Sequence, residues 1–244
     1  EMVKQLEAAY WANPQNGIYY TLLADLPESS TKTTEKDSEI INYAKQQTEK
    51  LGENFRLFIR ERTYYKEDDK WIGFERKRGA LLELNRAIIN GDLPKVNYVL
   101  TVDADTIIPI NTAIKMAQIM HHPLNRPHVD YVKGEAIVTR GYGLLQPAVN
   151  PSGLDRENST IFEKIYCEET GFDSYRCKTS DFYFDVCHEG IYTGKGMYDP
   201  YVFNSVLDGR FEKNSILSHD LLEGSFVRTG FVSDVHLYDS FPRT

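Results

Sequence analysis

The sequence has few cysteines, no long apolar run and fewer basic than acidic residues, and each of these excludes a class of protein. Cys167, Cys177 and Cys187 form no CxxC pair, which argues against a zinc site and favours free thiols in a reducing compartment. No apolar run approaches the ~20 residues that cross a bilayer. The opening EMVKQLEAAYW lacks the basic start and apolar stretch of a signal peptide. A net charge of −8 argues against a surface that coats nucleic acid.

The chain is nevertheless large enough to bury a core. Its 244 residues, 41% of them hydrophobic, suffice for one α/β domain or two tightly fused halves. Apolar stretches alternate with amphipathic ones, which is typical of βαβ units. The first residue is not Met, and the sequence stops at Phe241-Pro-Arg-Thr244. We therefore expect a soluble piece of a longer protein.

Hydrophobic spacing and turn residues predict the order of the elements. Strands are predicted at 17–27, 54–65, 98–102, 129–140 and 231–240. Helices are predicted at 40–51, 73–90, 111–120, 159–172 and 217–230. Gly91 and Gly230 are expected to end the helices that precede them, and Asn111 or Thr112 to cap another.

The stretch YVLTVDADTIIP ends an apolar strand on two acids, Asp103 and Asp105. Because the strand is apolar on both sides, we expect it in the centre of a parallel sheet, with ligands beyond its carboxyl end. In an extended chain these two carboxylates would face the same side, where they could hold Mg²⁺ or Mn²⁺. In the alternative interpretation, one Asp caps the following turn and the other is solvated.

Each of three further motifs is compatible with a binding role and with a purely structural one. Asp25 ends a strand, which suits a ribose or base contact or a turn cap. The basic run 76–79 precedes a helix and suits a phosphate or an exposed loop. The glycines of GIYTGKGM, at 190–197, do not follow Walker A order, but they would let the backbone approach a ligand or turn sharply.

The stretch SHDLLEG, at 218–224, places Asp220 near the start of a helix. A carboxylate there could act as a general base, if it lies within hydrogen-bonding reach of the proton that it removes. It could equally stabilise the helix dipole, with Ser218 as the cap. His219 could support Asp220, lie near a metal or pack at the surface.

Together, these segments resemble the glycosyltransferase domain of cyclic β-1,2-glucan synthases and, more broadly, family 2 glycosyltransferases such as cellulose synthase. The matching stretches cover nearly the whole chain in order: LLADLPES, RKRGALLELNR, TVDADTIIP, LLQPAVNPS, GIYTGKGMYDPYVF, GRFEKNSILSHDLLEGSFVRTGFVSDV and FP. The resemblance implies a GT-A, Rossmann-like α/β fold with a single mixed, mostly parallel sheet flanked by helices. It implies one catalytic domain over 1–244, with a nucleotide-sugar-binding half at 1–110 and an acceptor-binding half at 111–244.

The resemblance also implies a reaction and the residues that perform it. The reaction is inverting transfer of glucose from UDP-glucose to a growing β-1,2-glucan, dependent on Mg²⁺ or Mn²⁺. The implied residues are Leu23 and Asp25 at the uridine, Arg78 at the diphosphate, Asp103 and Asp105 at UDP and metal, Asp220 as base, and Tyr192, Gly194, Lys195 and Gly196 at the acceptor.

A QxxRW-like motif that follows the base in this family would fall beyond Thr244. Membrane helices that flank such domains are absent too. The implied parent lies at the cytoplasmic face of the bacterial inner membrane, and this chain would meet the membrane only through flanking segments. Three alternatives stay open: a family 2 transferase with another linkage or donor, a UDP- or glucan-binding module without turnover, and a nucleotidyltransferase, whose glycine- and basic-rich signature GIYYTLLADLP lacks.

Overall fold

The computed structural model describes residues 2–152, 182–211 and 219–239. The chain divides into two compact units, which are described separately. Unit 1 comprises Glu1–Val96 and Asp208–Leu217, and unit 2 comprises Asn97–Leu207 and Ser218–Thr244. The helix predicted at 159–172 lies outside the described residues, and so do Cys167, Cys177 and Ser218.

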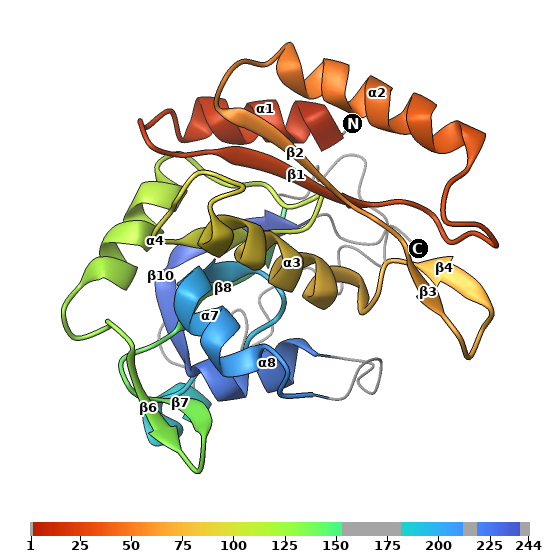
Figure 1. Cartoon of the computed structure of the whole chain (residues 1–244). Helices are drawn as coiled ribbons and strands as arrows, with labels where there is room; N and C mark the ends of the chain where they lie inside the picture. The colour runs from red at the N-terminus through yellow and green to blue at the C-terminus, as the bar shows by residue number, and fades with distance from the viewer. Residues whose placement is uncertain (1, 153–181, 212–218, 240–244) are drawn as a thin grey trace, which may run out of the picture. The chain divides into compact units, whose positions relative to one another are not determined.

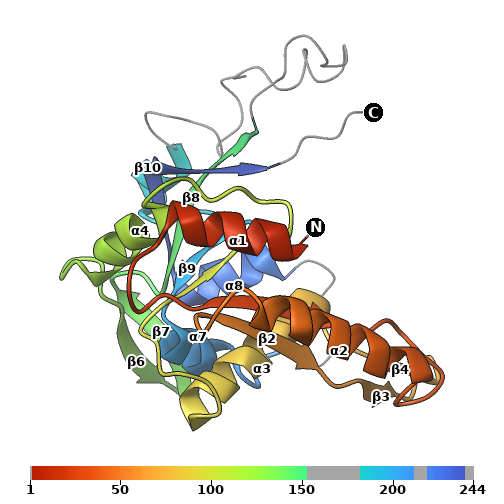
Figure 2. The same ribbon diagram turned by 90° about the horizontal axis from the view of Figure 1, so that it is seen from above.

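Unit 1 is built around two parallel strands and the helix that connects them. Its elements are α1 (Met2–Ala12), β1 (Tyr20–Asp25), α2 (Glu35–Glu49), β2 (Phe55–Arg60), β3 (Thr63–Tyr65), β4 (Lys70–Ile72) and α3 (Arg76–Asn90). β1 and β2 pair in parallel from Tyr20 and Phe55 to Asp25 and Arg60. α2 lies along one side of this pair and α3 on the other (Figure 1), and α2 follows β2 closely (Figure 2). Gly91 ends α3 in a left-handed conformation with a φ of 87°, which confirms the predicted stop.

The start of α2 is held by a buried ion pair. The backbone N–H of Thr34 donates to Asp37 Oδ2 (2.7 Å), and its hydroxyl donates to Asp37 Oδ1 (2.8 Å), as in a capping box. The guanidinium of Arg62 donates to the same two oxygens at 2.6 and 2.8 Å. Asp37 therefore joins the helix start to the segment that follows β2.

This pair predicts a loss of stability in acid. Hydrogen bonds from Arg62, opposed by burial and aided by Thr34, hold the pKa of Asp37 well below its usual range. Because the folded pKa is depressed, the stabilisation is present above the unfolded value of about 3.9 and is lost as pH falls toward the folded value. We expect Asp37→Asn to lower the melting temperature at pH 7, with the difference narrowing below about pH 4. Circular dichroism melts of both proteins from pH 7 to pH 3 would measure it; a constant difference would refute the coupling.

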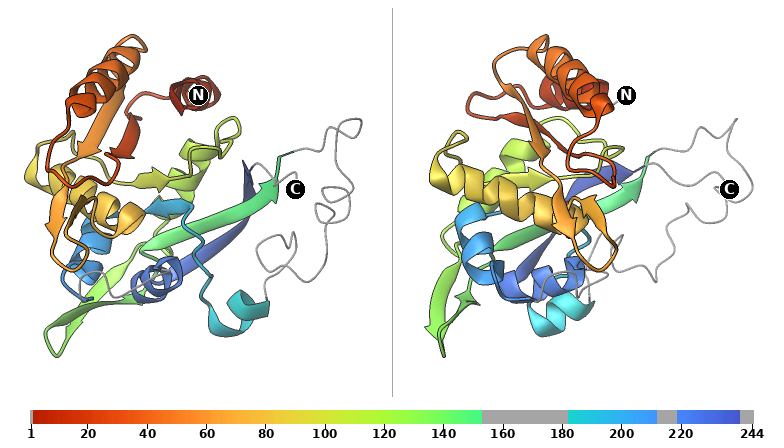
Figure 3. Two further views of the ribbon diagram at one scale, coloured as in Figure 1. Left: turned by 90° about the vertical axis from the view of Figure 1, so that its right-hand side faces the viewer. Right: turned by 45° about the vertical axis from the view of Figure 1, so that its right-hand side comes forward.

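Unit 2 contains a four-stranded sheet in the order β10-β8-β9-β5. Its elements are β5 (Val99–Thr101), α4 (Thr112–His121), β6 (His128–Val132), β7 (Glu135–Arg140), β8 (Leu144–Pro151), α6 (Phe182–Cys187), β9 (Gly196–Tyr198), α7 (Pro200–Leu207), α8 (Asp220–Val227) and β10 (Thr229–Asp239). β10 and β8 are parallel and lie side by side (Figure 3), whereas β9 is antiparallel to both β8 and β5.

Both faces of this sheet are covered. On one face, Met116 and Met120 of α4 pack against Leu145 of β8 and Met197 of β9. The residues next to these in β8 and β9 are buried as well, and Tyr198 stacks on Phe203 of α7 with 4.4 Å between ring centroids. Because neighbouring side chains of a strand point to opposite faces, α4 covers one side of the sheet and α7 the other.

Several fold predictions are wrong. The expected single, mostly parallel sheet is not found: residues 2–152, 182–211 and 219–239 form the four-stranded sheet and three two-stranded sheets. Within its sheet, β5 is an antiparallel edge strand rather than a central parallel one. The α/β class is nevertheless correct, because helices and strands alternate along the described chain.

Three predicted elements have other bounds because local backbone turns interrupt them. The segment 129–140 is the β6–β7 hairpin, which reverses at Lys133 and Gly134 with φ values of 53° and 87°. The segment 54–65 is divided into β2 and β3. α8 ends at Val227, followed by Arg228 at a φ of 57°, and Gly230 lies in β10. In the described ranges, each helix is too short or too polar to reach across a membrane.

Candidate functional site

The two acids of the DAD stretch lie on a turn. β5 ends at Thr101, and the backbone N–H of Thr106 donates to the carbonyl of Asp103 at 3.2 Å. The prediction that Asp103 and Asp105 sit on extended backbone is therefore wrong, because the alternation of a strand does not apply within a turn. Asp105 is exposed and Asp103 is partly exposed, so both carboxylates remain accessible from solvent.

Lys195 joins Asp103 to a third acid. Its Nζ lies 2.8 Å from Oδ2 of Asp103 and 2.8 Å from Oδ2 of Asp239, the last residue of β10. The hydroxyl of Thr106 donates to Oδ1 of Asp239 at 2.7 Å and accepts from the N–H of Asp103 at 3.3 Å. We call Asp103, Thr106, Lys195 and Asp239 the Lys195 network. Asp239 was not predicted, although an acid at the end of a predicted strand is the same signal that marked Asp25 and Asp103.

The charge on Lys195 is stabilised by its partners. Burial acts to lower the pKa of Lys195, but the hydrogen bonds and negative charges of Asp103 and Asp239 outweigh it and the pKa is raised. The side chain is therefore an ammonium ion at neutral pH, and it links the loop before β9 to the turn after β5.

Gly194 brings the same loop against Asp220. It has a φ of +82°, and a Cβ at this position would lie 3.0 Å from Oδ2 of Asp220. This glycine was expected to let the backbone approach a ligand or turn sharply; its positive φ fits the sharp turn, and the group that lies against it is a carboxylate of the chain itself. Asp220 thus lies against Gly194, and Asp103 pairs with the neighbouring Lys195.

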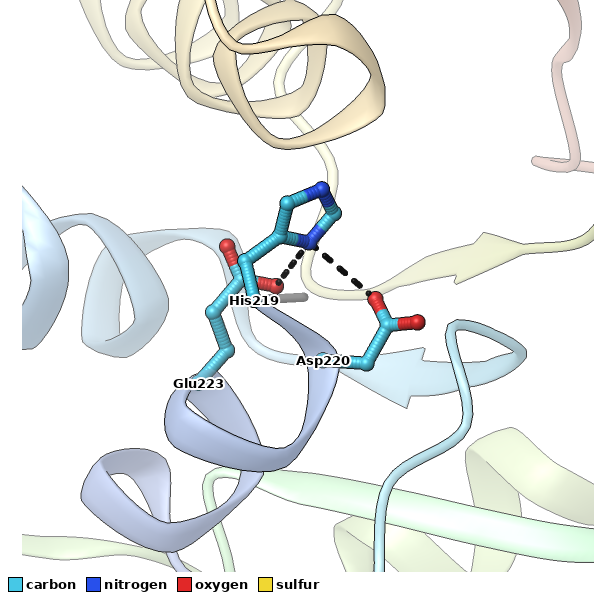
Figure 4. Close-up of side chains that lie close together, drawn as sticks. All are labelled: His219, Asp220 and Glu223. Atoms are coloured by element: carbon cyan, nitrogen blue, oxygen red, sulfur yellow. Dashed lines mark ion pairs between the residues drawn. The ribbon is translucent and has the colours of Figure 1, made fainter. Parts of the chain in front are cut away.

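Asp220 is the first residue of α8 and lies next to a buried acid (Figure 4). Nδ1 of His219 lies 3.2 Å from Oδ1 of Asp220 and 3.8 Å from Oε2 of Glu223, while its other ring nitrogen points away from both carboxylates. Glu223 is 1% exposed, whereas the Asp220 side chain is 34% exposed. Among the residues that the structure describes, these three form the one group of three or more His, Cys, Asp or Glu whose ligand atoms lie within 4.8 Å of one another. Glu223 was not predicted, and its helical spacing from His219 was the available signal.

Tyr192 and Gly196 lie in the interior. Tyr192 is 2% exposed, and its pKa is raised well above its ordinary value by burial and, next, by the charge of Glu223. A Cβ on Gly224 of α8 would lie 2.6 Å from the Cβ of Tyr192, so this tyrosine packs beneath the helix. Gly196 is paired with Thr101, and a Cβ there would lie 2.5 Å from the carbonyl oxygen of Leu145. Of the four residues predicted at the acceptor, Gly194 and Lys195 therefore lie beside the acids, whereas these two serve packing.

In unit 1, Asp25 is bound by a buried arginine. Nε and Nη2 of Arg60 donate to the two carboxylate oxygens of Asp25 at 2.8 and 2.6 Å. The same guanidinium donates to the carbonyls of Phe74 (2.6 Å) and Arg76 (3.0 Å). Asp25 is therefore the closer of two acidic partners of Arg60, since Oε1 of Glu83 lies 3.6 Å from its Nη1. Leu23 lies within β1 and is partly buried.

Arg78, predicted at the diphosphate, is also held inside unit 1. It forms an ion pair with Glu75 at 2.8 Å and lies over the ring of Phe211, with 4.9 Å between its Cζ and the ring centroid. Its side chain is buried. In this arrangement, Arg78 stabilises the start of α3.

Comparison with known proteins identifies one relevant relative. No protein-family model matches the sequence. The chain is 38% identical to a segment of cyclic beta-(1,2)-glucan synthase NdvB from Rhizobium meliloti (strain 1021), in an alignment of 262 positions. The alignment covers 99% of this chain and 9% of the relative. The chain is therefore homologous to a small segment of a glucan synthase and spans less than a tenth of its length.

Proposed function

We propose that this homologue of a glucan synthase segment is an inverting glycosyltransferase domain, which moves glucose from UDP-glucose to a growing β-1,2-glucan. The observation that supports this most is the convergence of Asp103, Lys195 and Asp220, which come from distant parts of the sequence and meet at the loop before β9. An accessible acid at a turn and an accessible acid at a helix start are two of the groups that such a transfer requires.

Asp220 is the base in this proposal. Inverting transfer requires attack on the anomeric carbon from the face opposite the leaving diphosphate, so the acceptor hydroxyl must lose its proton on that face. The Asp220 carboxylate is partly exposed, and Gly194 presents no side chain against it. The proton of the acceptor hydroxyl passes to this carboxylate as the new glycosidic bond forms and the bond to UDP breaks. His219, 3.2 Å from Oδ1, limits the orientations that the carboxylate can adopt.

The residues near the turn suit a divalent cation. Asp103 and Asp105 offer accessible carboxylate oxygens, which Mg²⁺ and Mn²⁺ prefer, and both ions keep several waters when only one or two protein ligands bind them. These two residues would hold the ion. When bound, it would offset the negative charge that develops on the leaving diphosphate.

Transfer itself is tested directly with labelled donors. The purified chain is incubated with a linear β-1,2-glucan, Mn²⁺ and either UDP-glucose or UDP-N-acetylglucosamine. We expect extension from UDP-glucose and release of UDP. Transfer from the second donor alone would assign a different family 2 activity, and UDP binding without release of product from either donor would make the chain a binding module.

Binding of UDP is expected to depend on the metal. In isothermal titration calorimetry, Mn²⁺ should strengthen UDP binding at least about tenfold, because the ion neutralises charge between carboxylates and diphosphate. Asp105→Asn should remove most of this gain. Asp68→Asn, a change to an exposed acid in the loop of unit 1, is the control and should leave UDP binding unaltered. Equal UDP affinity with and without Mn²⁺ would contradict the assignment of Asp103 and Asp105.

A further inference from the structure

Lys195 occupies a position between two carboxylates that could otherwise share a metal ion. We propose that Lys195 is an internal counter-ion, which holds Asp103 and Asp239 in place and competes with a divalent cation for their oxygens. Asp239 then joins Asp103 as an acid of the site. This inference rests on the proposed metal site, and it changes the role of Lys195 from acceptor contact to a positioning residue for the acids.

The first support is the geometry of the ammonium group. Its distances to the two carboxylate oxygens are equal, 2.8 Å each, so neither acid is the preferred partner. Asp103 follows β5, Lys195 precedes β9, and Asp239 ends β10. β5 and β10 are the two edges of the four-stranded sheet, so this one cation connects segments from its opposite sides.

The second support is the rigidity of the surroundings. The second oxygen of Asp239 accepts the hydroxyl of Thr106, and its carbonyl accepts the N–H of Ser152 at 2.7 Å. The neighbouring residues Ile107 and Tyr238 exchange backbone hydrogen bonds of 2.7 and 3.1 Å. The turn that carries Asp103 is thereby fastened to the end of β10. The acids are held in position before any ligand arrives, which lowers the cost of ordering them around an ion.

The third support is the balance of charge and exposure. Asp103 and Asp239 bring two negative charges against the single positive charge of Lys195, so the local sum is negative and favours a further cation. The Lys195 side chain is 14% exposed and that of Asp103 is 42% exposed, so the ammonium lies below the surface that its partner presents. An arriving ion must share Asp103 with Lys195. The lysine therefore weakens the binding of the bare ion.

The test measures Mn²⁺ binding by calorimetry without nucleotide. We expect Lys195→Met to bind Mn²⁺ about tenfold more tightly than wild type, because it removes the competing charge and leaves Asp103 and Asp239. Lys195→Arg keeps the charge and should stay close to wild type. Asp239→Asn should bind Mn²⁺ several-fold more weakly. The matched control is Lys115→Met, which breaks the 2.9 Å ion pair of Lys115 with Asp234 in the same unit and should change nothing.

Unchanged or weaker Mn²⁺ binding by Lys195→Met would overturn the proposal, as would tighter binding by Asp239→Asn. Circular dichroism establishes that each variant is folded; if Lys195→Met is not, Lys195→Gln and Asp239→Asn decide the result. Mn²⁺ binding requires neither UDP nor turnover. If Lys195→Met binds Mn²⁺ more tightly but the chain transfers no sugar, only the glycosyltransferase function is rejected. If the chain transfers sugar but Lys195→Met binds Mn²⁺ as wild type does, only this inference is rejected.

Discussion

Replacement of Asp220 by Asn is expected to reduce glucosyl transfer about 10³-fold while UDP binding stays near that of wild type. Asn has the shape of Asp but does not accept a proton from an acceptor hydroxyl. Because the Asp220 side chain is partly exposed and lies at the first turn of α8, the change should leave the fold intact. The loss should appear in the rate at saturating donor, since the removed function operates in the transition state.

Single-turnover transfer and calorimetric binding of UDP with Mn²⁺ measure the two halves of this prediction. Ser225→Ala is the control, since Ser225 lies on the same helix and its hydroxyl donates to the carbonyl of Leu221 (2.8 Å). It should be as active as wild type. If Asp220→Asn lost binding and transfer to the same degree, Asp220 would be a structural residue of α8 and the base would have to lie elsewhere.

Removal of the Asp25 carboxylate is expected to destabilise unit 1 by about 2–3 kcal/mol. The Arg60 side chain is 1% exposed, and Asp25 supplies its bidentate anionic partner, so Asp25→Ala would leave a buried guanidinium without full compensation. The value lies below the range for fully buried pairs because the Asp25 side chain is 32% exposed and water can reach it.

Tryptophan fluorescence during urea unfolding would report this change selectively, because Trp11 and Trp71, the two tryptophans of the chain, both belong to unit 1. Glu28→Ala is the control: Glu28 pairs with Lys70 at 3.6 Å on the surface, and its loss should cost at most about 0.5 kcal/mol. Equal stability of Asp25→Ala and wild type would mean that Glu83 and the carbonyls around Arg60 suffice. Asp25 would then not be required for the stability of unit 1, which would strengthen the role at the uridine that the resemblance implies.

Local patterns in the sequence predicted the elements whose signals are local. The strand at 17–27, the helix at 73–90 with its stop at Gly91, and the strand at 231–240 correspond to β1, α3 and β10. The pairing of strands did not follow from such patterns. β5 is apolar because α4 and the rest of unit 2 cover it. A strand can be covered in this way at the edge of an antiparallel sheet as well as at the centre of a parallel one, so its apolar composition does not distinguish the two positions. The hydrophobic pattern therefore identified a buried strand, but it did not show which strands pair with it.

The candidate site was predicted in part, for a similar reason. Asp103 and Asp220 could be singled out by residue type and by their place at a strand end and a helix start, whereas Lys195 was named only because the resemblance implied it. These residues lie close together because β9 pairs in antiparallel orientation, which places the preceding loop beside the acids. Asp239 and Glu223 were missed because an acid in a strand or helix is expected to face solvent, and only the fold shows which groups surround it. Conversely, the resemblance implied Tyr192 at the acceptor, and only its burial shows that it packs inside.

The irregular pairing of β10 lets one strand serve two purposes. Val232 pairs with Pro147 and His236 with Ala148, so Ser233, Asp234 and Val235 have no counterpart in β8. Val235 belongs to the core beside α4, whereas Asp239 lies beyond the irregularity. Because these three residues do not pair with β8, small changes in the packing of α4 can be absorbed here before they displace Asp239. We therefore expect the core of unit 2 to tolerate substitutions without a change in the position of the charged residues at its edge.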